Sequence, residues 1–342
     1  MLGHGNSEEG AAAQLGPAAE RFRHLVYGFR LPGLVKRCVP SALLARMYKK
    51  REQIEKGLYS RRSSQMQKRL YSWGLSRRKS FKPAAEHELA SASMSIIVAI
   101  HDAPSVTKRC LSSLERYARK SEVILIDDGS KMTETKELIR DFSDRNAWIA
   151  IRNDEARGHS AACEAGARLA SRSYLCLLNS DTVVTPWSWR TIEQAFDSDA
   201  RIGIAGPSTS ASGNVQTLGI AEHCRFYWND SQICAFAKRR MTARSQPALV
   251  DLPWADGFAF FIRRSLWQEL GGFDPKLPDY GNEIDLCKRA ANLGYRIVWV
   301  PNSYIHHLRH QSYGEVGEHE IGYRIWAAFQ YINQRHSPPS NQ

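Results

Sequence analysis

The stretch SIIVAIHDAPSVTKRCLSSLERYARKSEVILIDDGS, residues 95–130, decides the fold class. It begins with an apolar run over 95–100, continues with a helical pattern over 106–117, and returns to an apolar run over 122–128. Strands that are apolar throughout, joined by helices of about ten residues, are typical of parallel sheets that helices cover on both faces. The stretch therefore predicts an α/β domain.

The alternation of apolar runs and amphipathic segments continues beyond residue 130. We expect helices over 133–142 and 160–172, and further buried strands over 147–153 and 174–181. The resulting interpretation is an α/β fold with a mostly parallel central sheet and helices on both of its faces.

Polar side chains follow four consecutive predicted strands, at the point where each strand ends. They are His101 and Asp102, Asp127 and Asp128, Asn153 and Asp154, and Asn179 and Asp181. A single acidic strand end is most often a turn residue or a helix cap, but packing does not demand four in a row. Ligands of parallel sheets bind at the carboxyl ends of the strands, so these side chains predict a binding site there.

The motifs that are absent narrow the ligand class. No GxGxxG follows the first strand and no GxxxxGK[ST] occurs in the chain, so backbone cradling of a dinucleotide or triphosphate is poorly supported. A carboxylate-lined edge repels phosphate unless a divalent cation lies between them. Asp181 is suited to hold Mg²⁺ or Mn²⁺, and Asp127 is suited to accept hydrogen bonds from a base or ribose.

Six segments in order resemble the motifs of the family 2 glycosyltransferases, which have the A-type nucleotide-sugar-binding fold. The resemblance covers roughly residues 94–315. The segments are SIIVAIHD (95–102), VILIDDGS (123–130), RGHSAACEAGARLA (157–170), LLNSDTVVTP (177–186), DGFAFFIRRSLWQELGGFDPKLPDYGNEIDLCKRA (256–290) and GYRIVWVPNSYIHHLRHQS (294–312).

The resemblance implies a binding site for the nucleotide of a sugar donor. On this reading Ala99, His101 and Asp127 lie beside the base, and Asp154 and Gly158 lie near the base and ribose. The expected donor is a uridine or deoxythymidine diphosphate sugar.

The resemblance also implies a metal site for Mn²⁺ or Mg²⁺. Asp181 corresponds to the second aspartate of the family's Asp-x-Asp element, while the first position is Asn179. This leaves one carboxylate at the ion, although the amide oxygen of Asn179 could also ligate. His307 aligns with the histidine that contacts the metal or the diphosphate, and His306 is the second choice.

Glu283 falls at the position of the family's catalytic base, and Asp285 follows it two residues later. In an inverting transfer, one carboxylate takes the proton of the attacking acceptor hydroxyl. The alternative is structural, since acidic residues at a helix N-terminus complement the helix dipole. The implied activity is metal-dependent transfer of a sugar to a glycan or lipid-linked glycan, in surface polysaccharide or glycoconjugate synthesis.

Aromatic residues near these motifs are candidates for acceptor binding. Trp254 and Asp256 could line an acceptor pocket because aromatic faces stack on sugar rings, but Trp254 is equally plausible as a core residue. Trp187 and Trp189 are two residues apart and cannot share one helix face, so we expect one of them to be exposed or near the site.

The domain boundaries and the charge point to a basic N-terminal region. We divide the chain into an N-terminal region (1–93) with a disordered start, a basic helical segment and a linker, a glycosyltransferase domain (94–315), and a helical tail (316–342). The net charge of the 342 residues is +12. Residues 21–83 hold 18 Lys and Arg against two Glu, so the remainder of the chain is slightly acidic.

The role of the basic segment has several readings. On the first reading, the predicted helix over 41–62 lies on an anionic membrane surface. On the second reading, its apolar stripe packs on the catalytic domain and its charges are solvated. Nucleic acid is not an expected partner, because no aromatic-interleaved motif accompanies the charge. With no visible signal peptide and seven scattered cysteines without a CxxC pair, we expect a cytoplasmic protein, with peripheral contact to the inner face of the cytoplasmic membrane if the first reading holds.

Two other function classes stay open. A nucleotidyltransferase would carry a Gly-rich loop with Arg or Lys after the first strand, which HDAPSV (101–106) does not provide. A non-catalytic sugar-nucleotide-binding protein remains an alternative because Asn179 replaces one carboxylate of the metal element.

Overall fold

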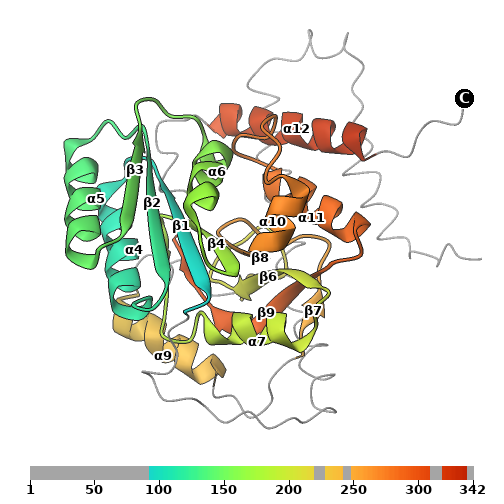
Figure 1. Ribbon diagram of the computed structural model, residues 1–342, viewed down its shortest axis with the longest axis horizontal. Helices are drawn as coiled ribbons and strands as arrows, with labels where there is room; N and C mark the ends of the chain where they lie inside the picture. The colour runs from blue at the N-terminus through green and yellow to red at the C-terminus, as the bar shows by residue number, and fades with distance from the viewer. Residues whose placement is uncertain (1–91, 219–227, 242–247, 309–317, 337–342) are drawn as a thin grey trace, which may run out of the picture. The chain divides into compact units, whose positions relative to one another are not determined.

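The computed structural model describes residues 92–218, 228–241, 248–308 and 318–336 (Figure 1). The expected disordered start and the basic helix over 41–62 lie outside these residues, so both stay predictions. Among the described residues, none of the helices combines the length and the apolar character needed to cross a bilayer.

An eight-stranded sheet forms the centre of the domain, in the order β3-β2-β1-β4-β8-β6-β9-β7. The strands β1 to β4 are paired in parallel, as are β6 and β9, while β8 and β7 run antiparallel to their neighbours. The expectation of a mostly parallel central sheet is therefore confirmed. The bounds are β1 Met94–Ile100, β2 Glu122–Asp128, β3 Ile149–Asn153, β4 Tyr174–Asn179, β6 Ile202–Ser208, β7 Val250–Asp251, β8 Ala259–Arg263 and β9 Arg296–Tyr304.

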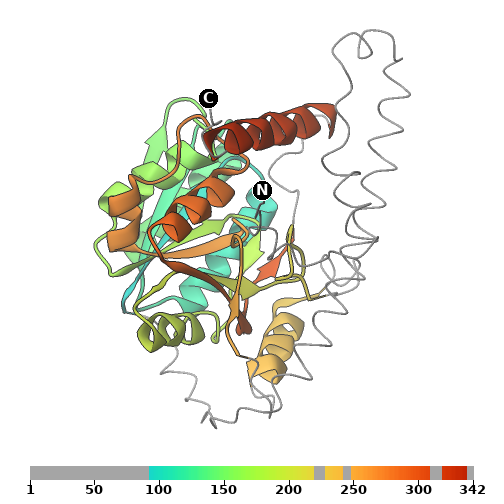
Figure 2. The same ribbon diagram turned by 90° about the vertical axis from the view of Figure 1, so that its right-hand side faces the viewer.

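Helices cover both faces of this sheet (Figures 1 and 2). Successive residues of a strand point to opposite faces, so Ile96 and Val98 of β1 pack into one apolar cluster with α4, α5 and α7, while Ile97 packs into another with α6, α10 and α11. The helices are α4 Pro104–Tyr117, α5 Thr133–Asn146, α6 His159–Leu169, α7 Arg190–Ser198, α9 Asp230–Met241, α10 Arg264–Leu270, α11 Asn282–Asn292 and α12 Glu318–Arg335.

The expectation that all of the predicted strands are buried was wrong for one of them. The strand expected over 147–153 is β3, which begins at Ile149 and lies at the edge of the sheet. Among the described strands it pairs with β2 alone, and Ile149 is 39% exposed. Trp187 and Trp189 are both buried, so neither is exposed, and the alternative that one of them lies near the site stays a prediction. The segment before α7 is not helical, so Trp187 packs toward α9 and Trp189 packs into the sheet cluster.

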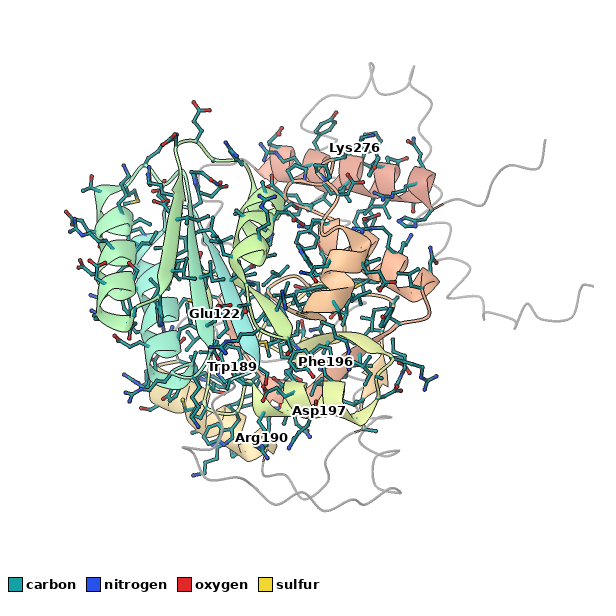
Figure 3. The ribbon with its side chains drawn as sticks, in the orientation of Figure 1. Glu122, Trp189, Arg190, Phe196, Asp197 and Lys276 are labelled. Carbon is teal, nitrogen blue, oxygen red and sulfur yellow. The ribbon has the colours of Figure 1, made fainter. Side chains whose placement is uncertain are left out.

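Trp189 and Phe196 anchor α7 beneath the sheet (Figure 3). The indole N–H of Trp189 donates to the carbonyl of Tyr117 at 2.9 Å, and the ring of Phe196 stacks on Tyr174 with centroids 4.6 Å apart. Tyr174 begins β4 and Tyr117 ends α4. These contacts therefore hold α7 on the face of the sheet opposite α6. The site is built at the other end of β4.

Candidate active site

Asp181 and His307 face each other just beyond the end of β4. A small two-stranded sheet of β5 (Thr182–Val183) and β10 (His306–His307) holds them, with His307 opposite Thr182. His307 Nε2 lies 3.2 Å from Asp181 Oδ1, and both side chains are buried. The pairing of strands that are far apart in the sequence therefore creates this part of the site.

The alternation of side chains in β10 distinguishes the two adjacent histidines. His306 is turned away from Asp181, because its Nδ1 lies 2.8 Å from the hydroxyl of Tyr304 and its ring stacks on Trp228. Successive residues of a strand project to opposite sides, so only His307 faces Asp181.

The residues at this position fit a divalent cation. Nδ1 of His307 lies 2.8 Å from the carbonyl oxygen of Ala211, which can only accept, so Nδ1 carries a proton and donates. Nε2 is left to face a carboxylate oxygen, an arrangement that is favourable only with a proton or a cation between the two atoms. A second hydrogen bond that fixes the ring in this way is the usual support of a metal-binding histidine.

The charge of Asp181 also governs the titration of His307. Burial by itself lowers the pKa of this imidazole, but the Asp181 carboxylate and the hydrogen bonds to Asp181 and Ala211 raise it above its usual value. No three His, Cys, Asp or Glu side chains are grouped as a metal cage within the described part of the chain. Two protein ligands that leave positions for substrate phosphate and water suit Mg²⁺ or Mn²⁺.

The segment Asp256–Phe258 joins Asp181 and His307 to the candidate base. The ring of Phe258 stacks on His307 with centroids 5.3 Å apart, and its carbonyl accepts a hydrogen bond from the Asn179 N–H at 2.9 Å. On the other side, a Cβ placed on Gly257 would lie 3.9 Å from the carboxyl carbon of Glu283. Three consecutive residues thus lie against both halves of the site.

Glu283 lies in the first turn of α11, and its surroundings disfavour its charged form. Burial, followed by the negative charge of Asp256, raises its pKa from 4.5 to about 7. A general base works best with a pKa near the operating pH. Its environment therefore suits Glu283 to accept a proton at neutral pH.

Asp285 has a different environment from Glu283. It is fully buried, its Oδ2 accepts from Arg289 Nε at 2.8 Å, and its Oδ1 lies 2.8 Å from His336 Nε2 and 3.4 Å from Arg335 Nε. These partners belong to α11 and to the end of α12. The structure thus engages both oxygens of Asp285 in joining two helices, and does not bring them to Asp181 and His307.

The predicted nucleotide side lies at the carboxyl ends of β1, β2 and β4. Register places Ala99 beside Asn179 of β4, and Asp127 at the end of β2. Asp127 is buried, accepts from the Ser130 N–H at 2.9 Å and forms an ion pair with Arg152 of β3. Arg152, which the sequence analysis did not single out, therefore occupies one oxygen of the Asp127 carboxylate.

Gly158 and His101 border the same edge through contacts to Asp128. Its carboxylate accepts from the backbone N–H of Gly158 at 2.9 Å, and its carbonyl lies 2.8 Å from His101 Nδ1. Gly158 has φ +90°, a conformation that favours glycine, and a side chain there would crowd Pro278. Asp154 is exposed in the bend after β3.

The two acceptor candidates have different surroundings. Trp254 packs against the apolar cluster on the α6 face, so its core role is the one that the contacts support. Asp256 accepts from the Gly213 N–H at 2.5 Å and, more weakly, from the Phe258 N–H at 3.4 Å. Its charge also acts on Glu283.

The sequence analysis missed a buried polar loop over 209–217. Gln216 is fully buried and accepts from the Asp256 N–H at 2.8 Å and from Asn214 at 3.0 Å, while its own amide donates to the Pro207 carbonyl at 2.8 Å. The same loop supplies the Ala211 carbonyl to His307. No motif marks these residues, because their role depends on contacts between distant segments.

His159, the first residue of α6, was also missed. Its ring lies against Phe273, with centroids 6.5 Å apart, and is close enough to Asp279, Asp128 and Asp181 to feel their charges. Burial nevertheless lowers its pKa below the usual value. In the sequence it stands unremarked inside RGHSAACEAG.

Solved structures with a similar fold are glycosyltransferases. The structure of GalNAc-T7 with UDP, GalNAc and Mn²⁺ matches with a TM-score of 0.54 and 18% identity, over 71% of this chain and 47% of that one. The mannosyltransferase PcManGT from Pyrobaculum calidifontis, in complex with GDP-Man and Mn²⁺, matches with a TM-score of 0.50 and 16% identity, over 83% of this chain and 70% of that one. The fold is therefore that of the A-type glycosyltransferases.

The sequence profile of glycosyl transferase family 2 matches residues 95–271, just over half of the chain. The chain therefore belongs to this family, and its fold is the fold of the similar solved structures.

Curated relatives match over shorter segments. An N-acetylglucosaminyl-diphospho-decaprenol L-rhamnosyltransferase of Mycobacterium tuberculosis (strain ATCC 25618 / H37Rv) is 27% identical over 28% of this chain and 31% of its own length. A poly-beta-1,6-N-acetyl-D-glucosamine synthase of Staphylococcus aureus (strain COL) is 31% identical over 30% of this chain and 26% of its own length. The chain thus spans about a third or less of the length of these relatives.

Proposed function

We propose that the chain is an inverting, metal-dependent glycosyltransferase that moves a sugar from a nucleotide diphosphate to an acceptor hydroxyl. The observation that carries the proposal is the segment Asp256–Phe258, which lies against His307 on one side and the Glu283 carboxylate on the other. This reaction needs a pair of residues that can hold a cation and a general base with a suitable pKa. The segment lies against both.

In the proposed reaction Glu283 accepts the proton of the acceptor hydroxyl, from a position within about 3 Å of it. The acceptor oxygen bonds to the anomeric carbon on the face opposite the nucleotide, and the bond from that carbon to the diphosphate oxygen breaks. The diphosphate leaves with the electron pair. Asp181 and His307 would hold a divalent cation, which would stabilise the charge on the departing diphosphate.

The finer assignments rest on resemblance and on relatives. We propose a uridine or deoxythymidine diphosphate sugar as donor, bound by Ala99, His101, Asp127, Asp154 and Gly158. We propose a glycan or lipid-linked glycan as acceptor, since one relative is named for a diphospho-decaprenol substrate and another for a polysaccharide product. Asp256 adjoins the base and is retained as an acceptor-side residue.

The structure leads us to revise one assignment within this proposal. Asp285 is a positioning residue, because its oxygens are engaged by Arg289, His336 and Arg335. Glu283 alone is assigned as the base.

The test is sugar transfer by purified full-length protein, measured by release of nucleotide diphosphate from a panel of nucleotide sugars with Mn²⁺. Changing Glu283→Gln is expected to lower kcat by about 10²- to 10⁴-fold, the usual contribution of general base catalysis. Asp181→Asn is expected to abolish the stimulation by Mn²⁺. The exposed residues Glu137 and Asp141 provide the matched controls Glu137→Gln and Asp141→Asn.

Thermal melting would show whether each variant is folded. Transfer that survives both Glu283→Gln and Asp181→Asn in folded protein would overturn the proposal. Nucleotide-sugar binding by the wild type without turnover would favour a non-catalytic binding protein instead.

A further inference from the structure

The start of α11, which carries Glu283, is hydrogen-bonded to the start of α6. The side-chain NH₂ group of Asn282, the first residue of α11, donates to the hydroxyl oxygen of Ser160 at 2.8 Å. Ser160 is the second residue of α6, and both residues are only 3% exposed. A hydrogen bond in such a buried place is strong, and either partner left alone there is costly.

The neighbours of this hydrogen bond fix its direction. The hydroxyl of Ser160 donates its one proton to the carbonyl of Leu277 at 2.5 Å, and a carbonyl can only accept. The Ser160 oxygen must therefore accept from the side chain at position 282. An amide supplies the donor that this requires, whereas an ionised carboxylate does not.

The oxygen of the same amide holds the main chain of Glu283. Oδ1 of Asn282 accepts from the backbone N–H of Glu283 at 2.9 Å. This N–H belongs to the first turn of a helix, where the backbone donors have no partner within the helix. The side chain of Asn282 thus connects the main chain of the candidate base to α6.

The start of α6 belongs to the predicted nucleotide side of the site. Gly158 directly precedes α6, and its backbone N–H donates to the Asp128 carboxylate. The segment before α11 packs here as well, because the Ser160 N–H donates to the Pro278 carbonyl at 2.8 Å and a Cβ on Gly158 would lie 3.2 Å from Pro278. A short path of buried contacts therefore joins the nucleotide side to the base.

We propose that Asn282 is a positioning residue for the transfer, which joins α11 to α6 and so places the Glu283 carboxylate relative to the sugar donor. This inference rests on the proposed function and deepens it. The base, the acceptor hydroxyl and the anomeric carbon must be aligned, and a displacement of about 1 Å can lower the rate about 100-fold. Asn282 is not among the proposed donor-binding residues, so its loss should lower kcat and spare the KM for the donor.

Steady-state kinetics of the full-length protein test this role, with uridine and deoxythymidine diphosphate sugars as donors and Mn²⁺ present. We expect Asn282→Ala to lower kcat by about 10- to 100-fold and to leave the donor KM within about twofold of the wild type. Asn282→Asp keeps the size of the side chain but does not donate when ionised, so it should lower kcat as well.

The pH profile separates the position of Glu283 from its ionisation. Asn282→Ala keeps the Asp256 charge and the buried location of Glu283, so kcat/KM should still rise through about pH 7. Asn282→Asp places a second carboxylate next to Glu283, so in this variant the rise should move to higher pH.

A double-mutant cycle identifies the partner of Asn282. Ser160→Ala should lower kcat to a similar extent, and the double variant should fall little further, because both changes remove the same hydrogen bond. Ser143→Ala is the matched control, since Ser143 is also buried and donates to the Arg140 carbonyl at 2.9 Å, but lies in α5 on the opposite face of the sheet. It should keep the wild-type kcat, and melting curves establish that each variant is folded.

Wild-type kcat in folded Asn282→Ala would overturn this inference alone, and so would losses that multiply in the double variant. An equal fall of kcat in Ser143→Ala would overturn it too, because lost stability would then explain the effect. Transfer that survives Glu283→Gln, or no transfer by the wild type from any of the donors, would overturn the proposed function and this inference with it.

Discussion

Glu283 shows how one residue's surroundings set its chemistry. Glu283 and Asp285 lie in the same turn of α11, and both are acidic. Glu283 is desolvated beside the like charge of Asp256, which raises its pKa, whereas Asp285 is paired with Arg289 and His336. The first arrangement favours holding and releasing a proton near neutral pH, and the second joins α11 to the end of α12.

The pH dependence of transfer should report Glu283. The base acts when deprotonated, so kcat/KM is expected to rise with pH through about 7 and then level off. Asp256→Asn removes the charge that helps to raise this pKa, so the rise should move to lower pH. Rates measured from pH 5 to 9 test this, and an unchanged midpoint in the variant would contradict it.

Protein stability should respond to the same group. Folding raises the pKa of Glu283 from 4.5 to about 7, so the folded state binds more protons and stability falls as pH rises through this window. Glu283→Gln cannot ionise and escapes this cost. It should gain about 2 to 3 kcal/mol more over the wild type at pH 8 than at pH 5.

Urea unfolding at the two pH values measures this difference. Glu137→Gln, at an exposed position of α5, is the control and should show no such pH dependence. Equal gains at pH 5 and pH 8 for Glu283→Gln would show that Glu283 titrates normally.

At the level of elements, local sequence predicts the strands and helices well but not how distant segments meet. Apolar runs such as 95–100 and 122–128 are buried strands because their composition suits a sheet covered on both faces. The exposure of β3 depends on its place at the edge of the sheet. Strand order is a property of the whole chain, so the run over 147–153 could not show it.

The same limit applies to the candidate site. Asp181, His307 and Glu283 were singled out because they stand in recognisable motifs. Gln216 was not, since it acts by contact with Asp256, which is 40 residues further along the chain. A hydrogen bond across such a separation leaves no local pattern, and only the three-dimensional packing shows it.

Helix α12 provides a test of the role of Asp285. Asp285→Asn would leave Arg289, which is only 15% exposed, without its carboxylate partner. Breaking a buried pair from one side costs about 3 to 5 kcal/mol, so the unfolding midpoint in urea should fall clearly. Transfer activity, measured where the variant is still folded, should fall far less than in Glu283→Gln.

A matched comparison separates positioning from catalysis at Asp285. Arg324→Ala removes an exposed ion pair of the same helix, to Asp279, and should change stability by less than about 1 kcal/mol. Loss of activity in Asp285→Asn as large as in Glu283→Gln, with little change in stability, would restore Asp285 to the catalytic residues.

For the molecule as a whole, the positive net charge and the candidate active site belong to different parts of the chain. Residues 21–83 hold the basic excess, while the rest of the chain is slightly acidic. We propose that this segment attracts the enzyme to anionic lipid, which brings the site to a lipid-linked acceptor. Each Lys or Arg near such a surface contributes about 1 kcal/mol.

Flotation with lipid vesicles tests this attraction on the full chain. Full-length protein should float with vesicles containing anionic lipid at low salt and much less with neutral vesicles or at high salt, because salt screens charge. Changing Arg61, Arg62, Lys68 and Arg69 to Glu should abolish flotation. Equal flotation by the variant, or none by the wild type, would contradict the membrane role.

The doublet His306–His307 has a consequence for how the gene can change. In β10, position 307 faces Asp181 and position 306 faces Tyr304 and Trp228, and a slip of one residue exchanges the two sides of a strand. Insertion of one residue before His306 would place that histidine at the position opposite Asp181. After such an insertion His306 would take the place of His307, so the insertion need not remove the imidazole from the site.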